Sequence, residues 1–329
     1  MKNGTLCADQ VQAGTTDERS ADELAGDISD RFPSDELGLD IVEPMYRSLP
    51  LVLASPHSGR DYSEAFLAAS RLDALALRRS EDSFVDELFA GARGLGAPLL
   101  RAHFPRAYVD PNREPYELDP SMFVDSLPEG VNTQSARVRG GLGTVARVVA
   151  DGSEIYRGKL CFEDADFRIR KFYRPYHAAL TELIQVTKRR FGFVILIDCH
   201  SMPSVGGPMD SDAGSKRADF ILGDRHGTSC HPVVTLTAER VLKQRNFTVC
   251  RNTPYAGGFT VQHYGCPKEG VHALQIEINR ATYMDEARIC RGPQFAGITA
   301  EMTRVVAAVG RIDPVVLDAA RCSPGDLIP

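Results

Sequence analysis

The sequence predicts an α/β fold: a single domain in which a mostly parallel, mixed sheet is covered by helices. Two observations support this prediction. Apolar runs of strand length, such as LPLVLA and FVILID, alternate with stretches of helical periodicity, and such alternation is typical of a sheet covered by helices. Several of these runs also end in polar residues, which suits a sheet whose ligands bind beyond the carboxyl ends of its strands.

The predicted elements begin with a strand at 49–54 and a helix over 80–96, in which Phe84, Leu88 and Phe89 recur at helical spacing. Two short strands, APLLRA and AYVD, follow. The rest of the chain alternates in the same way. Its predicted elements are a helix at 162–191, strands at 193–198 and 219–223, a helix at 232–245, strands at 247–250 and 273–278, and a helix at 293–309.

The chain divides into three parts by composition. Residues 1–45 are rich in Asp, Glu, Ser, Gly and Thr, which predicts a mobile or loosely packed segment. Residues 46–329 form the predicted domain. Within it, residues 113–160 are polar and glycine-rich, and because long loops inside compact domains tend to be functional, this insertion is a candidate lid.

Charge and hydropathy exclude two classes of partner. The formal net charge is −6 and no run of Lys and Arg stands out, which argues against nucleic-acid binding. No apolar segment approaches the roughly 20 residues that cross a bilayer, and the N-terminus lacks the apolar core of a secretory signal. We therefore predict a cytoplasmic protein without membrane contacts.

The eight cysteines include no CxxC pair, which favours reduced structural thiols. Cys199 adjoins His200, but alternation along a strand places it on the opposite face from Asp198 and His200. We therefore expect Cys199 to be structural.

Two histidines follow apolar runs in matching contexts: His57 in SPHSG and His200 in DCHS. Neutral imidazoles are favoured ligands of Zn²⁺, and catalytic zinc sites use three protein ligands. The pair therefore predicts a zinc site at the carboxyl edge of the sheet. Asp198 shares a face with His200 and is placed to orient its ring.

The third zinc ligand is left open by the sequence, since there is no HExxH motif. The carboxylates between His57 and the next strand are Asp61, Glu64 and Asp82. We favour Asp82, although an acidic residue near the start of a helix also suits a contact with the helix dipole.

Two further charged residues are candidates for a catalytic role. Glu277 lies within the apolar run ALQIEI, where it is either a general base or the partner of a buried salt bridge to Arg280 or another cation. Arg113 follows Asn112 in VDPNR. It is either a bidentate partner for a substrate carboxylate or part of a surface salt bridge.

Eight short motifs in order resemble the N-formylglutamate amidohydrolase family, over roughly residues 50–285. They are SPHSG, SEDSFVDEL, VDPNR, YRPYH, DCHS, DFILG with HGTSC, GGFTVQHYG and VHALQIEINRATYM. The family is similar to zinc carboxypeptidases and succinylglutamate desuccinylases, so the resemblance implies a zinc-carboxypeptidase-like (phosphorylase/hydrolase-like) fold.

The resemblance implies one Zn²⁺ per chain held by His57, Asp82 and His200, with Glu277 as base and Arg113 as binder of the substrate carboxylate. Further candidates for substrate binding are Asn112, Arg174, His263 and Arg280, of which the last three would contact the carboxylates or the oxyanion. Carboxypeptidases place their carboxylate ligand three residues after the first histidine, where this chain has Arg60. The third ligand therefore remains open among Asp82, Asp61 and Glu64.

The activity that the resemblance implies is hydrolysis of an N-acyl amino acid, with N-formyl-L-glutamate, an intermediate of histidine catabolism, as the leading substrate. Members that act in histidine degradation often carry a histidine after the paired glycines, where this chain has Phe259. One alternative is a zinc hydrolase of another N-acyl amino acid or a short peptide. The other is a metal-free binding protein on the same scaffold.

Overall fold

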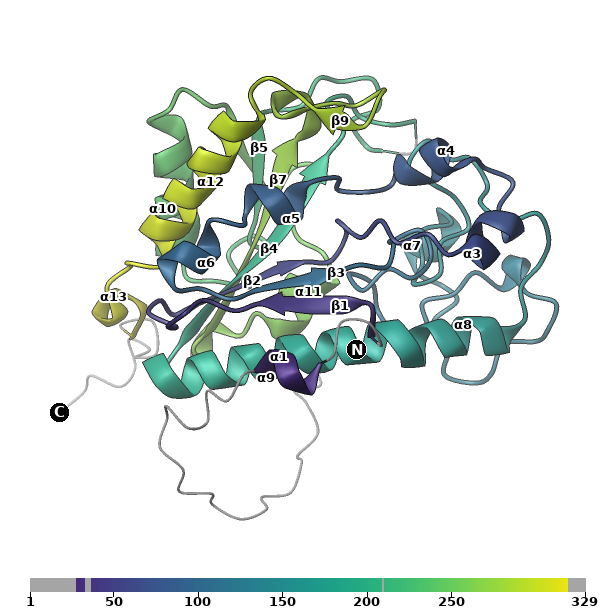
Figure 1. Ribbon diagram of the computed structural model, residues 1–329, viewed down its shortest axis with the longest axis horizontal. Coiled ribbons are helices and arrows are strands. Elements are labelled where there is room, and N and C mark those ends of the chain that lie inside the picture. Colours follow the sequence, from purple (N-terminus) through teal and green to yellow (C-terminus); the bar gives the residue numbers. More distant parts are fainter. Residues whose placement is uncertain (1–27, 33–36, 209, 319–329) are drawn as a thin grey trace, which may run out of the picture.

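Seven strands form one sheet through the middle of the structure (Figure 1). The structure is a computed structural model that describes residues 28–32, 37–208 and 210–318. From edge to edge the strands are β1 (Leu39–Val42), β3 (Leu99–Ala102), β2 (Leu51–Ser55), β4 (Val194–Met202), β7 (Val271–Asn279), β5 (Phe220–Gly223) and β6 (Val249–Arg251). β3, β2, β4 and β7 run parallel, whereas β1 is antiparallel to β3 and β5 is antiparallel to β7. The predicted mostly parallel, mixed sheet is confirmed.

Helices cover both faces of the sheet (Figure 1). The central strands β2, β4 and β7 are therefore buried on both sides, as is usual for parallel strands. One apolar cluster joins the sheet to α5 (Val85–Leu88), α6 (Ala92–Leu95), α10 (Pro232–Lys243), α12 (Phe295–Val309) and α13 (Pro314–Asp318). A second cluster joins its other face to α1 (Ile28–Arg31), α9 (Arg174–Phe191) and α11 (Phe259–Tyr264). A two-stranded ribbon, β8 (Met284–Asp285) with β9 (Cys290–Arg291), follows β7.

The longest predicted helix is confirmed as one continuous helical run. It consists of α8 (Phe162–Arg168), a π-helical turn (Ile169–Tyr173) and α9. The run extends along the sheet and reaches past its edge beneath the insertion (Figure 1). Its sheet-facing side is apolar, with Tyr176, Leu180 and Leu183 fully buried, which is the burial pattern of an amphipathic helix.

The insertion at 113–160 has an apolar core of its own. Leu118, Val145 and Ile155 pack with Phe66 and Leu77. The last two residues lie on α3 (Glu64–Ala69) and α4 (Ala74–Arg78), and the insertion adds a short helix, α7 (Ala136–Arg139). A buried apolar cluster fixes the insertion as a packed layer beside the sheet.

The prediction of one helix over 80–96 is wrong, because the chain forms the two short helices α5 and α6 there. Phe84 adopts a positive φ of 67°, a left-handed conformation that ends helical geometry. Gly91 separates the two helices, and a side chain there would meet Thr303 of α12 at 2.3 Å. Asp82 consequently precedes α5 in an irregular turn.

Two further predictions need correction. AYVD is no strand, because the amide of Tyr108 bonds the carbonyl of Pro105 in a turn. Residues 1–45 were expected to be mobile or loosely packed, yet Ile28 and Leu39 are buried and β1 pairs with β3 in the sheet. Residues 1–27 and 33–36 lie outside the described residues.

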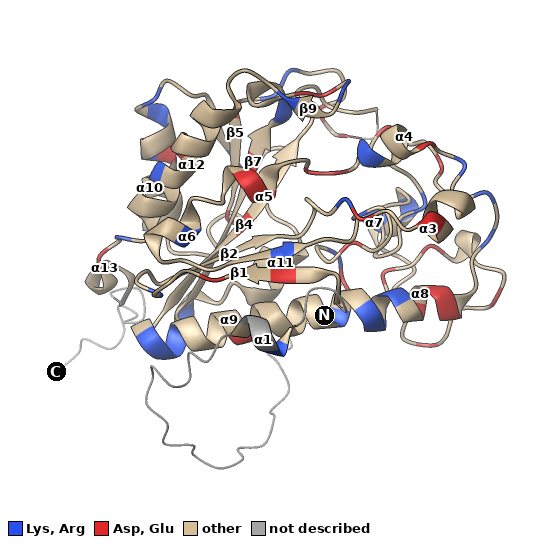
Figure 2. Ribbon diagram, viewed as in Figure 1, with Lys and Arg blue, Asp and Glu red and all other residues tan. Residues whose placement is uncertain are grey.

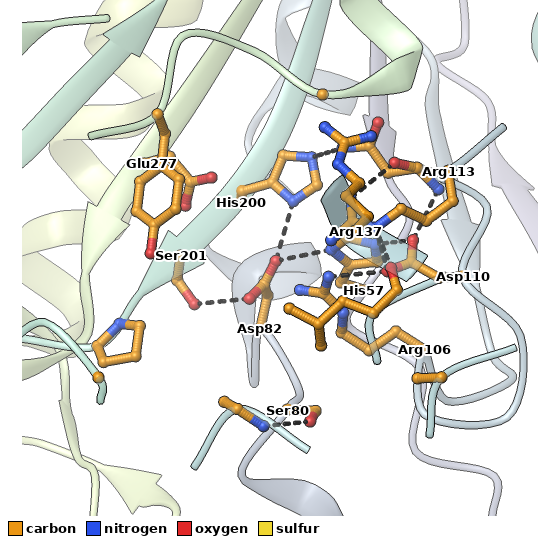
Figure 3. A pocket seen from close by; sticks show the side chains of 18 of the residues that line it. His57, Ser80, Asp82, Arg106, Asp110, Arg113, Arg137, His200, Ser201 and Glu277 are labelled. Carbon is orange, nitrogen blue, oxygen red and sulfur yellow. Dashed lines mark hydrogen bonds and ion pairs between the residues drawn. The ribbon is translucent and has the colours of Figure 1, made fainter. Parts of the chain in front are cut away.

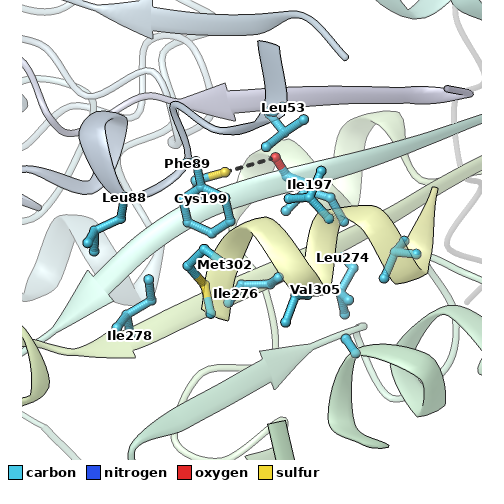
Figure 4. Packing of buried hydrophobic residues seen from close by; sticks show 14 of the residues in the cluster. Leu53, Leu88, Phe89, Ile197, Cys199, Leu274, Ile276, Ile278, Met302 and Val305 are labelled. Carbon is cyan, nitrogen blue, oxygen red and sulfur yellow. Dashed lines mark hydrogen bonds between the residues drawn. The ribbon is translucent and has the colours of Figure 1, made fainter. Parts of the chain in front are cut away.

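Cys199 lies in the apolar cluster between β4 and α12, against Leu53, Phe89 and Met302 (Figure 4). Its thiol is buried, and burial raises its pKa well above the usual range. The expectation that Cys199 faces away from His200 and serves the core is confirmed.

The strands at the centre of the sheet carry few charges (Figure 2). β4 and β7 have one acidic residue each, Asp198 and Glu277, and both are buried. Elsewhere acidic and basic residues are interspersed over the helices and loops (Figure 2). Among the described helices, none is long and apolar enough to cross a membrane.

Candidate functional site

A cavity of about 360 Å³ opens where β2, β4 and β7 end (Figure 3). His57 follows β2, while His200 and Glu277 lie near the carboxyl ends of β4 and β7. The insertion closes one side of the cavity through residues between Arg137 and Ala150. The predicted position of the site at the carboxyl edge of the sheet agrees with this geometry.

His57, Asp82 and His200 converge in the cavity, and all three are buried. Nδ1 of His57 lies 3.2 Å from Oδ2 of Asp82, and Nδ1 of His200 lies 3.0 Å from the same oxygen (Figure 3). The backbone amide of Asp82 donates to the carbonyl of His57 at 3.0 Å. This bond holds the turn that carries the carboxylate to the two rings.

The other two carboxylates that the sequence offered lie outside this group. The side chains of Asp61 and Glu64 are exposed, and neither lines the cavity. Asp61 approaches His103 instead, at 4.0 Å. Of the three candidates, the fold brings Asp82 alone to the two histidines.

A second carboxylate contacts the other ring nitrogen, Nε2, of each histidine. Nε2 of His57 lies 2.7 Å from Asp110, and Nε2 of His200 lies 2.9 Å from Asp198. An imidazole that donates its Nε2 proton to a carboxylate presents the lone pair of Nδ1 to a metal, as in carboxylate–histidine–metal triads. The predicted contact of Asp198 with His200 is confirmed, whereas the sequence reasoning missed Asp110.

The donor set fits a metal ion. Two imidazole nitrogens and one carboxylate oxygen lie within 4.8 Å of one another, which is the ligand chemistry of a catalytic zinc site. Burial raises the pKa of Asp82, but the hydrogen bonds and charges of His200 and His57 outweigh it and hold that pKa well below its usual range. Asp82 is therefore an ionised carboxylate that can serve as a ligand.

Arg280 contacts Asp82 rather than Glu277. Its guanidinium donates to Oδ1 of Asp82 at 3.0 Å, to the hydroxyl of Ser201 and to the carbonyl of Arg79. The alternative prediction, a salt bridge between Glu277 and Arg280, is therefore wrong. With all three nitrogens engaged, Arg280 fixes the Asp82 carboxylate, and this arrangement does not favour the predicted substrate contact.

Glu277 lies opposite His200 across the β4–β7 pair and lines the cavity. The amide of Gln275 donates to its Oε1 at 2.8 Å. Burial raises the pKa of Glu277 to about 7, although the charge of His200 opposes the shift. A carboxylate with a pKa near neutrality can both accept and return a proton at neutral pH.

Asn112 and Arg113 both line the cavity. The Asn112 amide is already engaged, because it donates to Asp198 and accepts from the amide of Thr260. It therefore supports His200 and Asp198 rather than standing free for a substrate. Arg113 donates to the carbonyls of Leu142 and Asn112, so its guanidinium is fixed at the cavity wall.

Two predicted substrate-binding residues do not reach the cavity. Arg174 is exposed and its nearest polar partner is the Tyr116 hydroxyl, at 3.4 Å. His263 is exposed and stacks on Phe259 with ring centroids 4.9 Å apart. They lie in two motifs of the family resemblance, YRPYH and GGFTVQHYG, and the fold leaves both side chains outside the cavity.

The sequence reasoning also missed two arginines of the cavity wall, Arg106 and Arg137. Arg106 pairs with Asp110 at 2.8 Å. Asp110 itself stands two residues before Asn112 in the quoted motif VDPNR, so its proximity to a candidate site residue was a usable signal. Arg137 lies in the polar insertion, where no motif singles it out.

The fold and the site together define an α/β protein with a candidate mononuclear metal centre and a buried carboxylate at the carboxyl edge of its sheet. The family model for N-formylglutamate amidohydrolase matches residues 49–284. The chain therefore belongs to the N-formylglutamate amidohydrolase family.

Relatives agree with this assignment. The chain is 32% identical over 242 residues to an N-formylglutamate deformylase of Pseudomonas aeruginosa and 29% identical over 241 residues to one of Pseudomonas putida. Each match covers 72% of this chain and 83% of the relative. The crystal structure of N-formylglutamate amidohydrolase from Ralstonia eutropha is 34% identical, with a TM-score of 0.76 over 87% of this chain and 99% of that one.

Proposed function

We propose that the protein is a metal-dependent amidohydrolase that cleaves N-formyl-L-glutamate to formate and L-glutamate. The observation that carries the proposal is the convergence of His57, Asp82 and His200 beside Glu277, in a cavity lined by arginines. Family membership and the names of the two Pseudomonas relatives support the choice of substrate.

His57, Asp82 and His200 would hold one Zn²⁺. When bound, the ion would act as a Lewis acid toward the scissile carbonyl and lower the pKa of water. Asp110 and Asp198 keep the Nδ1 atoms of the two histidines directed at the site, and Arg280 keeps Asp82 in place. These contacts position the ligands before any ion binds, which reduces the reorganisation that binding requires.

Glu277 is the proposed general base. It takes a proton from the attacking water and delivers it to the amide nitrogen that leaves as the amino group of glutamate. Its pKa of about 7 suits both transfers. Arg113 binds a substrate carboxylate, because its guanidinium is held at the cavity wall by two backbone carbonyls and a planar guanidinium matches a carboxylate.

The insertion at 113–160 is proposed to cover the bound substrate, since its residues already form one wall of the cavity. A cover excludes water from the reacting atoms and strengthens the electrostatic interactions inside. The cytoplasmic location and the role in histidine catabolism stay predictions.

The test is release of formate and amino acid from a panel of N-formyl and N-acetyl amino acids, with elemental analysis of the same purified protein. We expect turnover of N-formyl-L-glutamate, about one zinc per chain, and loss of activity with a chelator that added zinc restores. Zinc with turnover of other N-acyl substrates alone would favour the alternative substrate class. A protein without metal or turnover would favour the binding-protein alternative.

A further inference from the structure

Four arginines line the cavity, and two of them make close ion pairs with a carboxylate. Arg280 pairs with Asp82 at 3.0 Å and Arg106 pairs with Asp110 at 2.8 Å. The remaining two are Arg113 and Arg137. Arg113 has only a longer contact with a carboxylate, and the Arg137 side chain has none among the described residues.

Arg113 has no carboxylate to itself. Its nearest acidic group is Asp110, at 3.8 Å, and the two oxygens of Asp110 already contact Arg106 and His57. Burial and the positive charges of Arg137 and Arg106 together lower the pKa of Arg113 to about 10, although the charge of Asp110 opposes the shift. Arg113 and Arg137 line the same cavity, where two like charges repel each other.

Arg137 lies on α7, and the guanidinium makes no hydrogen bond or ion pair with any residue that the structure describes. Its backbone is nevertheless well fixed. Ser135 caps the helix by accepting from the amide of Val138, whose side chain is buried. A side chain without a partner on a fixed backbone is available to a ligand.

Leu142 links the two arginines. Its amide donates to the carbonyl of Arg137 at 2.8 Å, and its carbonyl accepts from Nε of Arg113 at 2.9 Å. In the view of Figure 3, Arg106, Arg113 and Arg137 lie toward His57 and Asp110, whereas Glu277 lies beyond His200. Arg106, Arg113 and Arg137 therefore lie on the His57 side of the cavity, and the proposed base lies on the other side of His200.

Two guanidiniums that line one cavity without a close carboxylate partner favour an anionic ligand. We propose that Arg137 binds the side-chain carboxylate of the substrate and thereby selects N-acyl amino acids with acidic side chains. The inference rests on the proposed function. Arg113 binds the α-carboxylate instead. Its guanidinium donates to the backbone carbonyl of Asn112, and the side chain of Asn112 contacts the candidate metal ligand His200.

The test compares N-formyl-L-glutamate with N-formyl-L-glutamine, which has nearly the same shape but lacks the side-chain charge. We expect Arg137→Gln in the zinc-loaded protein to lower kcat/KM for the glutamate substrate by about 10- to 100-fold, the range of a charge-assisted hydrogen bond. Turnover of the glutamine substrate should change less than threefold, and Arg137→Lys should restore part of the preference.

The matched control is Arg139→Gln on the same helix, because Arg139 is exposed and does not line the cavity. It should leave both substrates unchanged. An equal loss of both substrates in Arg137→Gln, or no loss of either, would overturn the proposal.

A binding measurement separates this inference from the proposed function. Glutarate carries two carboxylates and no amide, so its binding by calorimetry needs no turnover. If the wild type cleaves no N-formyl substrate, the proposed function fails. Arg137 would still be supported as a carboxylate-binding residue by glutarate binding that Arg137→Gln weakens at least 10-fold, and it would be refuted by equal binding to both proteins.

Discussion

His200 and Glu277 occupy paired positions on the neighbouring parallel strands β4 and β7. In-register residues of adjacent strands leave the sheet on the same face, so the backbone ladder itself sets the distance between a candidate metal ligand and the proposed base. Because every residue of both strands is buried, packing on both faces of the sheet holds this spacing.

Glu277→Gln should abolish most of the hydrolysis while preserving the metal. Glutamine keeps the shape and the contact with Gln275 but cannot accept the proton from water, so kcat should fall by about 10²- to 10⁴-fold. Formate release and zinc content of the same sample measure both effects. Glu269→Gln, in the exposed turn before β7, is the control, and an active Glu277→Gln enzyme would exclude Glu277 as base.

Asp82→Ala should lose zinc, whereas Asp61→Ala and Glu64→Ala should retain it. Asp82 is the carboxylate that contacts both histidines, and the other two side chains are exposed. Zinc content after dialysis against a weak chelator distinguishes the three variants. Full zinc retention by Asp82→Ala would contradict the proposed ligand set.

Asp110→Asn should weaken metal binding about 10- to 100-fold, as loss of an outer contact to a metal-bound histidine commonly does. The substitution keeps the size of the side chain but removes the charge that faces His57 and Arg106. Competition with a chromophoric chelator measures the affinity. Asp164→Asn, on the exposed side of α8, should bind zinc like the wild type, and an unchanged affinity for Asp110→Asn would argue against the positioning role.

Activity should rise with pH through an apparent pKa of about 7 or somewhat lower. The proposed base must be ionised, burial raises the pKa of Glu277 to about 7, and a bound cation would shift the pKa downward. A profile of kcat/KM between pH 5 and 8.5 shows this limb. A profile that is flat across this range would be inconsistent with Glu277 as the base.

In the metal-free protein, the buried Glu277 should lower the free energy of unfolding as pH rises. Its pKa is raised from 4.5 to about 7 on folding, so the unfolded chain releases the proton first and the free energy of unfolding falls between these two values. The full loss is about 3 kcal/mol at most. Urea unfolding of metal-free wild type and Glu277→Gln should therefore show a larger advantage for the variant at pH 8 than at pH 5; an equal difference at both pH values would rule out this linkage.

Local sequence pattern determined the sheet and the strand-end residues of the site. Apolar runs of strand length predicted β2, β4 and β7, and alternation along a strand separated His200 from Cys199. These features depend on neighbouring residues and on the period of a strand, so a single sequence is enough to state them.

Tertiary structure alone decided which loop side chains reach the cavity. Asp82 joins His57 because an irregular turn replaces the first part of the predicted helix, and Arg280 binds Asp82 rather than Glu277. Arg137 enters from an insertion that packs on a separate apolar core, while Arg174 and His263 point elsewhere. Such contacts join segments far apart in the chain, and they depend on how whole layers pack rather than on any local pattern of residues.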